Sequence, residues 1–206
     1  MSLRIGISMR ETRAQAYVED RDTLARDWAV YMTKSFSDSM WMYIPNIEED
    51  AVSYFQKWDL NVLFLTGGDD IGMYPCRDKT ELLLLKHAID NQIPVIAVCR
   101  GMQLVNTYFG GHNNTGDSAF AGRHRAKLHQ IKVHGTMRMV NSYHNNYIDE
   151  NSLSREFEVI ARDKNDSSIE GFKGKGILAM MWHPERKGND DEWNTSLIKK
   201  FIKDTI

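Results

Sequence analysis

A cysteine at the end of an apolar segment is the first residue of this chain that could perform chemistry. Residues 94–98 are apolar, Cys99 follows them directly, and Gly101 and helix-forming residues come next. A side chain at a sharp strand-to-helix turn projects above a sheet, and small flanking residues let neighbouring backbone approach. The start of a helix also favours the thiolate, the reactive form of cysteine. Cys99 is therefore a candidate nucleophile, and a buried structural cysteine is the alternative.

A nucleophilic cysteine needs a base and a group that orients the base. His183 follows an apolar segment in the sequence MMWHPER, and Glu185 lies two residues later. The proline between them restricts the turn, so both side chains could face one cleft. With Glu185 on one imidazole nitrogen and Cys99 on the other, the three residues would divide the roles of a catalytic triad. A solvated loop is the alternative for this segment.

Acyl transfer also needs donors for the oxyanion that forms on the substrate. The sequence TGGDD, residues 66–70, places small residues at the end of an expected strand. The backbone N–H of Gly68 could approach a substrate carbonyl there, and the N–H of Arg100 would be the second donor. A tight turn is the alternative for the two glycines.

Short apolar segments alternate with helical patterns along most of the chain. We expect strands at residues 3–9, 61–68, 94–98, 157–162, 168–173 and 176–182, and helices at residues 22–36, 79–91, 101–108 and 191–204. Continuous apolar strands separated by helices are typical of a parallel sheet covered on both faces. The sequence therefore predicts a three-layer α/β domain with a mainly parallel sheet, whose functional residues lie at the carboxyl ends of strands.

The composition sets limits on the class of protein. A length of 206 residues predicts a single domain, residues 1–206, and a net charge of −2 gives no general attraction to nucleic acid or membrane. No apolar segment approaches the ~20 residues of a membrane span. The only cysteines are Cys76 and Cys99. With no signal-peptide pattern, they predict a reduced, cytoplasmic protein without disulfides. Cys76 has no neighbouring base and is expected to be structural.

The segments GGDD, PVIAVCRGMQLVNTYFGG, VNSYHNN and MWHPER resemble the class I (triad-type) glutamine amidotransferases. More narrowly, they resemble the γ-glutamyl hydrolases of the peptidase C26 group, which includes γ-glutamyl-γ-aminobutyrate hydrolase. The resemblance extends over residues 1–186. It implies a flavodoxin-like fold with a nucleophile elbow and no metal or organic cofactor. The departure is Ala97, where the family usually has glycine, so the elbow is tightened by one methyl group.

The resemblance also implies the roles of particular residues. It implies hydrolysis of a γ-glutamyl amide bond, with release of glutamate and an amine, through a thioester on Cys99. The residues carried over are the triad Cys99, His183 and Glu185, the oxyanion donors Gly68 and Arg100, and the substrate-binding residues Gln103, Ser142, Tyr143 and His144.

A basic segment leads into the substrate-binding part of the chain. Residues 118–148 contain no Asp or Glu but carry Arg123, Arg125, Lys127 and Lys132. We expect some of these side chains to face the leaving group and to favour an anionic one, such as a nucleotide phosphoramidate in capsule biosynthesis. A solvated basic loop is the alternative.

Three histidines in the same segment recur every five residues, at His124, His129 and His134. This spacing matches neither a helix face nor a strand face. It favours a polar hairpin or loop over a metal site, and we expect no metal.

Other functions share parts of this pattern. The chain could be a glutaminase subunit that delivers ammonia to a synthetase partner, although GGDD and MWHPER favour a stand-alone hydrolase whose only partner is a small γ-glutamyl substrate. A stress protein of the PfpI/DJ-1 type would have histidine beside the cysteine, where Arg100 stands. A catalytically dead binding module is disfavoured by the joint presence of Cys99, His183 and Glu185. A homodimer is left open.

Overall fold

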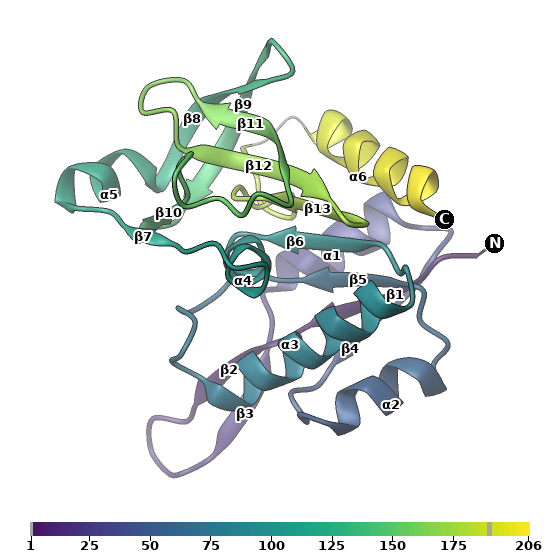
Figure 1. Cartoon of the computed structure of the whole chain (residues 1–206). Coiled ribbons are helices and arrows are strands. Elements are labelled where there is room, and N and C mark those ends of the chain that lie inside the picture. The colour runs from purple at the N-terminus through teal and green to yellow at the C-terminus, as the bar shows by residue number, and fades with distance from the viewer. Residues whose placement is uncertain (1, 189–190) are drawn as a thin grey trace.

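A nine-stranded sheet forms the centre of the computed structural model, which describes residues 2–188 and 191–206 (Figure 1). Across the sheet, the strands are β4 (Met40–Ile44), β1 (Arg4–Ser8), β5 (Val62–Leu65), β6 (Val95–Val98), β13 (Ile177–Met180), β12 (Ile169–Gly174), β11 (Glu158–Asp163), β8 (Arg125–Val133) and β9 (Thr136–Tyr143). Strands β5, β6 and β13 are buried along their whole length, as the continuous apolar segments predict.

The two halves of the sheet pair differently. The pairings from β4 through β1, β5 and β6 to β13 are parallel. The pairings from β13 through β12, β11 and β8 to β9 are antiparallel. The sheet is therefore mixed with a parallel core, which corrects the expectation of a mainly parallel sheet. The reason is local: two-residue turns join β8 to β9 and β12 to β13, and such short connections join only antiparallel strands.

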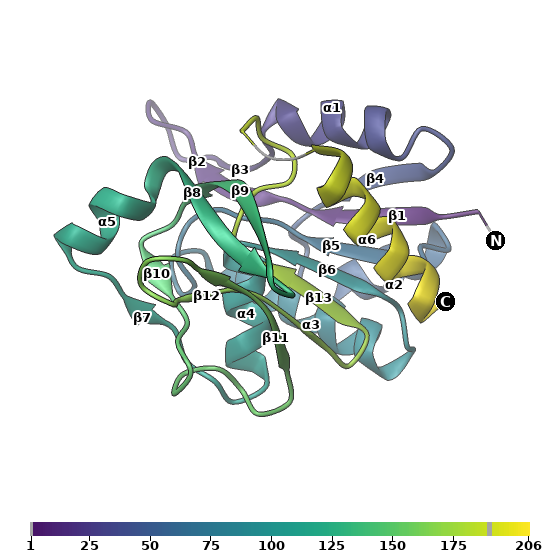
Figure 2. The same ribbon diagram turned by 90° about the horizontal axis from the view of Figure 1, so that it is seen from above.

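Helices cover both faces of the parallel core. They are α1 (Arg26–Ser35), α2 (Asp50–Lys57), α3 (Pro75–Asp90), α4 (Arg100–Tyr108) and α6 (Asp191–Thr205). Helix α5 (Ser118–His124) lies away from this core and packs against β8 (Figure 1). Figure 2 shows α1 on one side of the parallel strands and α3 and α4 on the other. Helix α6 packs next to α1, where Thr195 hydrogen-bonds Ser35 at 3.2 Å. The expected three-layer α/β arrangement is present in this part of the chain.

Two short ribbons complete the fold. Strand β2 (Arg10–Arg13) pairs with β3 (Asp20–Thr23), and β7 (Asn114–Thr115) pairs with β10 (Asn146–Tyr147). The strand β3 explains why the helix expected at residues 22–36 begins only at Arg26. The other expected helices and strands are present with small shifts at their ends. Strands β2, β3, β4, β7 and β10 and helices α2 and α5 were not predicted, and the segment of β8 and β9 was expected only as a polar hairpin or loop.

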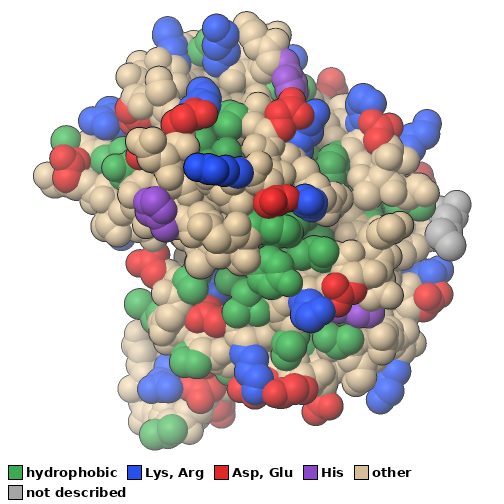
Figure 3. All heavy atoms as spheres, in the orientation of Figure 1, with side chains coloured by type: hydrophobic (Ala, Val, Ile, Leu, Met, Phe, Trp, Pro, Cys, Tyr) green, Lys and Arg blue, Asp and Glu red, His purple; other side chains and the backbone are tan. Residues whose placement is uncertain are grey.

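The surface mixes the two signs of charge. On the face seen in Figure 3, apolar side chains gather near the middle, over α3 and α4, and Lys and Arg alternate with Asp and Glu around them. Among the described residues, no helix combines the length and the apolar character needed to cross a bilayer.

A close approach of two backbones supports the turn after β6. A Cβ atom added at Gly101 would lie 2.5 Å from the carbonyl oxygen of Leu65 in β5. Backbone cannot move aside as a flexible side chain can, so helix α4 needs glycine at this position to approach the sheet. The small residue expected after the cysteine is explained by this contact.

Replacing Gly101 with alanine should destabilise the protein by about 1–3 kcal/mol, the usual cost of overpacking a closely packed site. The matched control is Gly122→Ala in helix α5, where an added Cβ meets no described atom within 4 Å. Because alanine is the better helix former, this control should keep or raise stability by about 0.5–1 kcal/mol. Urea unfolding of both variants measures the difference. Equal effects would show that the contact with Leu65 is not a constraint.

Candidate active site

Cys99 occupies a strained turn between β6 and α4. Its backbone has φ 52° and ψ −104°, a conformation that residues with a side chain rarely adopt. Its N–H donates to the carbonyl of Met180 at 2.8 Å, so β13 holds the turn in place. Cys99 as a whole is 6% exposed. Ala97, the departure from the family pattern, is fully buried in β6, and its methyl group is accommodated in the core.

His183 and Glu185 meet Cys99 at the end of β13. The Nδ1 atom of His183 lies 2.7 Å from Oε1 of Glu185, and the imidazole also hydrogen-bonds the Cys99 thiol. Asn141 of β9 holds the base by its backbone: its side-chain oxygen accepts from the N–H of His183 and its NH2 group donates to the carbonyl, both at 2.9 Å. The three expected triad residues thus form one connected, buried chain of hydrogen bonds.

The electrostatics of this group favour an ion pair. Burial alone would lower the pKa of His183, but the negative charges of Glu185 and Cys99 outweigh it and raise the pKa to about 9. Burial alone would raise the pKa of Cys99, but the charge and the hydrogen bond of His183 lower it below the ordinary thiol value. At Cys76, burial and the nearby carboxylates of Glu11, Glu48 and Asp22 instead raise the pKa. A thiolate is therefore favoured at Cys99 and disfavoured at Cys76.

The two expected oxyanion donors both belong to the turns around Cys99. Gly68 has φ 149° and lines the same cavity as Cys99. Arg100 is the first residue of α4, and the first N–H groups of a helix have no partner within it. The Arg100 side chain is buried and forms ion pairs with Glu81 and Asp78 of α3, so it anchors the start of the helix while its backbone N–H stays at the turn.

A cavity of about 300 Å³ opens beside Cys99. Its walls are Gly68, Asp69, Asp70, Met73, Cys99, Gln103, Arg125, Tyr143, His144, Asn145 and Asn146. Three of the four expected substrate-binding residues, Gln103, Tyr143 and His144, are among them. The fourth, Ser142, is fully buried, and its hydroxyl donates to the carbonyl of His124. Its side chain therefore supports the hairpin.

Comparison with known proteins places the chain in a family. The peptidase C26 family matches residues 5–185. The chain belongs to the peptidase C26 family. The γ-glutamyl-CDP-amidate hydrolase of Campylobacter jejuni is 29% identical over 96% of both chains. A glutamine amidotransferase-like protein of Lactococcus lactis, YvdE, is 29% identical over 70% of this chain and 74% of its own.

Solved structures show the same fold. A glutamine amidotransferase from Thermotoga maritima has a TM-score of 0.65 and a sequence identity of 14% to this chain. The match covers all of this chain and 86% of that protein. A Thermoplasma acidophilum protein assigned to GMP synthase has a TM-score of 0.72 and 19% identity, and the match covers all of this chain and 94% of that protein. The expectation of a hydrolase of the C26 group within the glutamine amidotransferase-like superfamily is confirmed.

The basic residues of this C26 chain divide between two cavities. Arg125, at the start of β8, lines the cavity with Cys99. Arg123 and Lys127 line a separate cavity with His129 and Asp163. Arg123 is further engaged by an ion pair with Asp166 at 3.3 Å. Of the three expected leaving-group contacts, only Arg125 is placed on the side of the nucleophile.

Several residues of the site were not identified from the sequence. Asp69 and Asp70 follow the two glycines of the oxyanion turn, and Asn146 hydrogen-bonds Asp70 at 2.9 Å across the cavity. Asp69 and Asp70 directly follow the two glycines, and Asn146 lies close after the segment NSYH. These positions in the sequence could have identified the three residues as part of the site. The contact of Asn141 with His183 was not predictable, because 42 residues separate the two in sequence.

The ion pair predicts a bell-shaped pH profile of kcat/KM. Activity should rise as Cys99 loses its proton and fall around pH 9 as His183 loses the proton that the leaving group needs. Glu185→Gln removes a negative charge that raises the pKa of His183, so the alkaline limb should move to lower pH. Glu156→Gln, an exposed carboxylate elsewhere, is the control. An unmoved alkaline limb in Glu185→Gln would contradict the proposed coupling.

Proposed function

We propose that this chain is a single glutamine amidotransferase-like domain of the flavodoxin-like type that hydrolyses a γ-glutamyl amide bond, with Cys99 as nucleophile. The observation that carries the proposal is the buried chain Cys99–His183–Glu185, which opens onto a cavity bounded by Gly68 and Arg125. A thiolate, an orienting carboxylate and a turn of backbone donors are the parts that acyl transfer requires.

In the first half of the reaction, the Cys99 thiolate attacks the δ-carbonyl carbon of the γ-glutamyl group. The carbonyl oxygen becomes an oxyanion, which accepts hydrogen bonds from the N–H groups of Gly68 and Arg100. Each such donor is typically worth about 3–4 kcal/mol in the transition state. Protonated His183 then gives its proton to the departing nitrogen, and a thioester remains on Cys99.

In the second half, neutral His183 takes a proton from water, and the resulting hydroxide attacks the thioester. Collapse of the tetrahedral intermediate releases glutamate, and Cys99 leaves as the thiolate while His183 keeps the proton. Glu185 stabilises the imidazolium in both halves. The reaction as written needs no metal or organic cofactor.

The charges of the cavity support a conjugate with an anionic leaving group. Asp69 and Asp70 can face the α-ammonium group of the glutamyl residue, and Arg125 places a guanidinium on the same cavity. Guanidinium groups bind phosphate oxygens in a bidentate manner. The similarity to the Campylobacter jejuni hydrolase supports a γ-glutamyl nucleotide phosphoramidate as substrate.

Arg125→Ala should lower kcat/KM for a γ-glutamyl nucleotide phosphoramidate by about 10–100-fold, the usual effect of losing a hydrogen bond to a charged group. Hydrolysis of a neutral γ-glutamyl amide should change little. Arg123→Ala is the matched control, because it removes a nearby arginine that lines the other cavity. Glutamate release from both substrates measures the effect.

The same experiment separates the alternatives. Equal losses for the anionic and the neutral substrate would show that Arg125 binds the glutamyl group and would refute its role at the leaving group. Slow release from glutamine alone would favour a glutaminase subunit that awaits a synthetase. Activity that survives in Cys99→Ala would refute the proposed nucleophile.

A further inference from the structure

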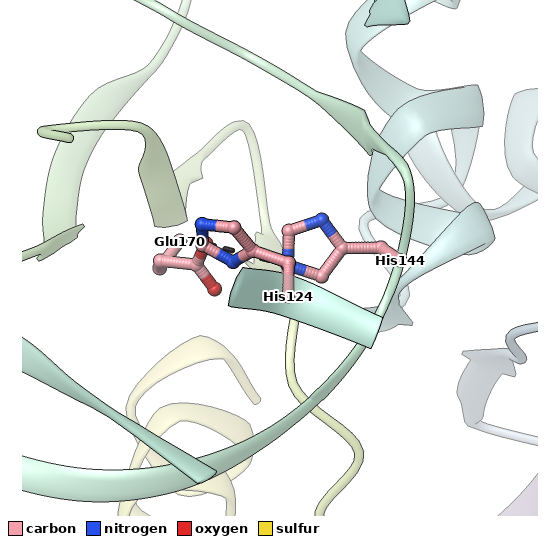
Figure 4. Close-up of side chains that lie close together, drawn as sticks. All are labelled: His124, His144 and Glu170. Atoms are coloured by element: carbon pink, nitrogen blue, oxygen red, sulfur yellow. Dashed lines mark ion pairs between the residues drawn. The ribbon is translucent and has the colours of Figure 1, made fainter. Parts of the chain in front are cut away.

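Behind the substrate cavity lies a second group of ionisable side chains that the proposed reaction does not use. His124 at the end of α5, His144 after β9 and Glu170 in β12 are at most 4% exposed. Figure 4 shows the two imidazoles and the carboxylate converging from three separate segments. The donor atoms of this group lie within 4.8 Å of one another.

Each histidine of the group is oriented by a partner on its outer nitrogen. Nε2 of His124 lies 2.8 Å from the Asp166 carboxylate, and Nδ1 of His144 lies 2.8 Å from the carbonyl of Asn146. Carboxylate and carbonyl oxygens accept, so these outer nitrogens carry the hydrogens. When the ring is neutral, its other, inner nitrogen, which is Nδ1 of His124 or Nε2 of His144, carries no hydrogen and presents a lone pair. This arrangement is the usual one for histidines that bind a metal.

The inner nitrogens face Glu170. The distance to its Oε1 atom is 4.0 Å from Nδ1 of His124 and 3.5 Å from Nε2 of His144. A neighbouring histidine, His129, approaches the other oxygen, Oε2, at 3.6 Å and is oriented by Asp163 at 2.8 Å. Donor atoms around a tetrahedral zinc ion are about 3.3 Å apart for bonds of 2.0–2.1 Å, so the observed spacings are close to those of a metal site.

Some polar atoms of the group lack hydrogen-bond partners. Nδ1 of His124 is not among them, because it lies 3.4 Å from the Ser142 hydroxyl. Among the described residues, Nε2 of His144, Nε2 of His129 and Oε2 of Glu170 are buried and have none. Ser168 lies 3.4 Å from Oε1 of Glu170, but its hydroxyl donates to Asp166 at 2.8 Å. Buried carboxylates and imidazoles left in this state are costly. The negative charge of Glu170 raises the pKa of His144 in spite of its burial. The charge of Glu170 is therefore compensated either by a proton on Nε2 of His144 or by a cation bound in its place.

We propose that His124, His144 and Glu170 bind a divalent transition-metal ion with the ligand preference of zinc. Two imidazole nitrogens and one carboxylate oxygen suit this class of metal. The ion would compensate the charges of Glu170 and of the orienting carboxylates, and it would fix the β8–β9 hairpin to β12. A cavity of about 340 Å³ is lined by His124 and His129, and an ion would enter from this side.

The site also touches the active site. His144 is one of the residues that line the substrate cavity, and its Nε2 lies 3.5 Å from Glu170. A metal on Nε2 would hold this wall of the cavity in one position. The proposed ligands are not the three histidines that recur every five residues in the sequence. His134 is exposed in the turn between β8 and β9. His124 instead meets His144 and Glu170, which are distant from it in the chain.

Metal titration of the full-length Cys99→Ala protein, without a histidine tag, tests the proposal. The Cys99→Ala background removes the thiolate that could bind zinc with His183. After treatment with a chelator, the protein should take up one equivalent of Zn²⁺ or Co²⁺ by elemental analysis. Co²⁺ should give visible d–d absorption without thiolate-to-metal charge transfer, and Zn²⁺ should displace it and raise Tm.

Variants locate the ion. Glu170→Gln and His124→Gln should each weaken binding by about 100-fold or more, and Asp166→Asn, which only orients His124, by about 10–100-fold. His134→Gln is the matched control and should bind as tightly as the parent. Circular dichroism identifies any variant that fails to fold. Binding below one equivalent in the folded parent, or unchanged binding in folded Glu170→Gln, would overturn the proposal.

Discussion

One buried carboxylate, that of Glu81 in α3, holds the turns of the candidate active site in place. It forms ion pairs with Arg77 of its own helix and with Arg100 of α4, and it accepts a hydrogen bond from Ser8 of β1 at 2.6 Å. Arg77 in turn donates to the carbonyls of Thr66 and Gly67, both at 3.0 Å. The charge of Glu81 is almost wholly removed from water, and its pKa is nevertheless lowered, because burial is outweighed by the two arginines. Removing one partner would leave an uncompensated buried charge, which is why such a cluster keeps a unique geometry.

This cluster explains why two strained turns can coexist. Gly68, with φ 149°, and Cys99, with φ 52°, both deviate from ordinary backbone, and both lie next to a residue held by the Glu81 cluster. Strain of this kind persists only where the surroundings over-determine it. A Cβ at Gly67 would lie 2.6 Å from the imidazole of His183, so the base also depends on the close approach of this turn. The proposed oxyanion donors, nucleophile and base are therefore positioned by one rigid unit.

The sequence predicted those features that are local. The apolar segments before Gly67 and Cys99 indicated buried strands, and the small residues beside them indicated tight turns, so the triad and the donors could be proposed before their geometry was known. Residues 125–143 were harder, because their polar side chains show no continuous apolar run; the hairpin was suspected, but its place in the main sheet was not. The partners of His124 come from residues 18 or more positions away, and a pattern search along the chain cannot bring them together.

The mixed sheet separates chemistry from recognition. The parallel core carries Gly68 after β5 and Cys99 after β6, while the antiparallel half carries Arg125, Tyr143 and His144. The triad base follows β13, the strand that pairs in parallel with β6 and antiparallel with β12. The proposed nucleophile is thus fixed by the half of the sheet that is buried on both faces, and the residues proposed to face the leaving group belong to a hairpin near the edge. Substitutions in that hairpin can change the shape and charge of the cavity without disturbing the elbow, so one catalytic unit can serve hydrolases with different leaving groups.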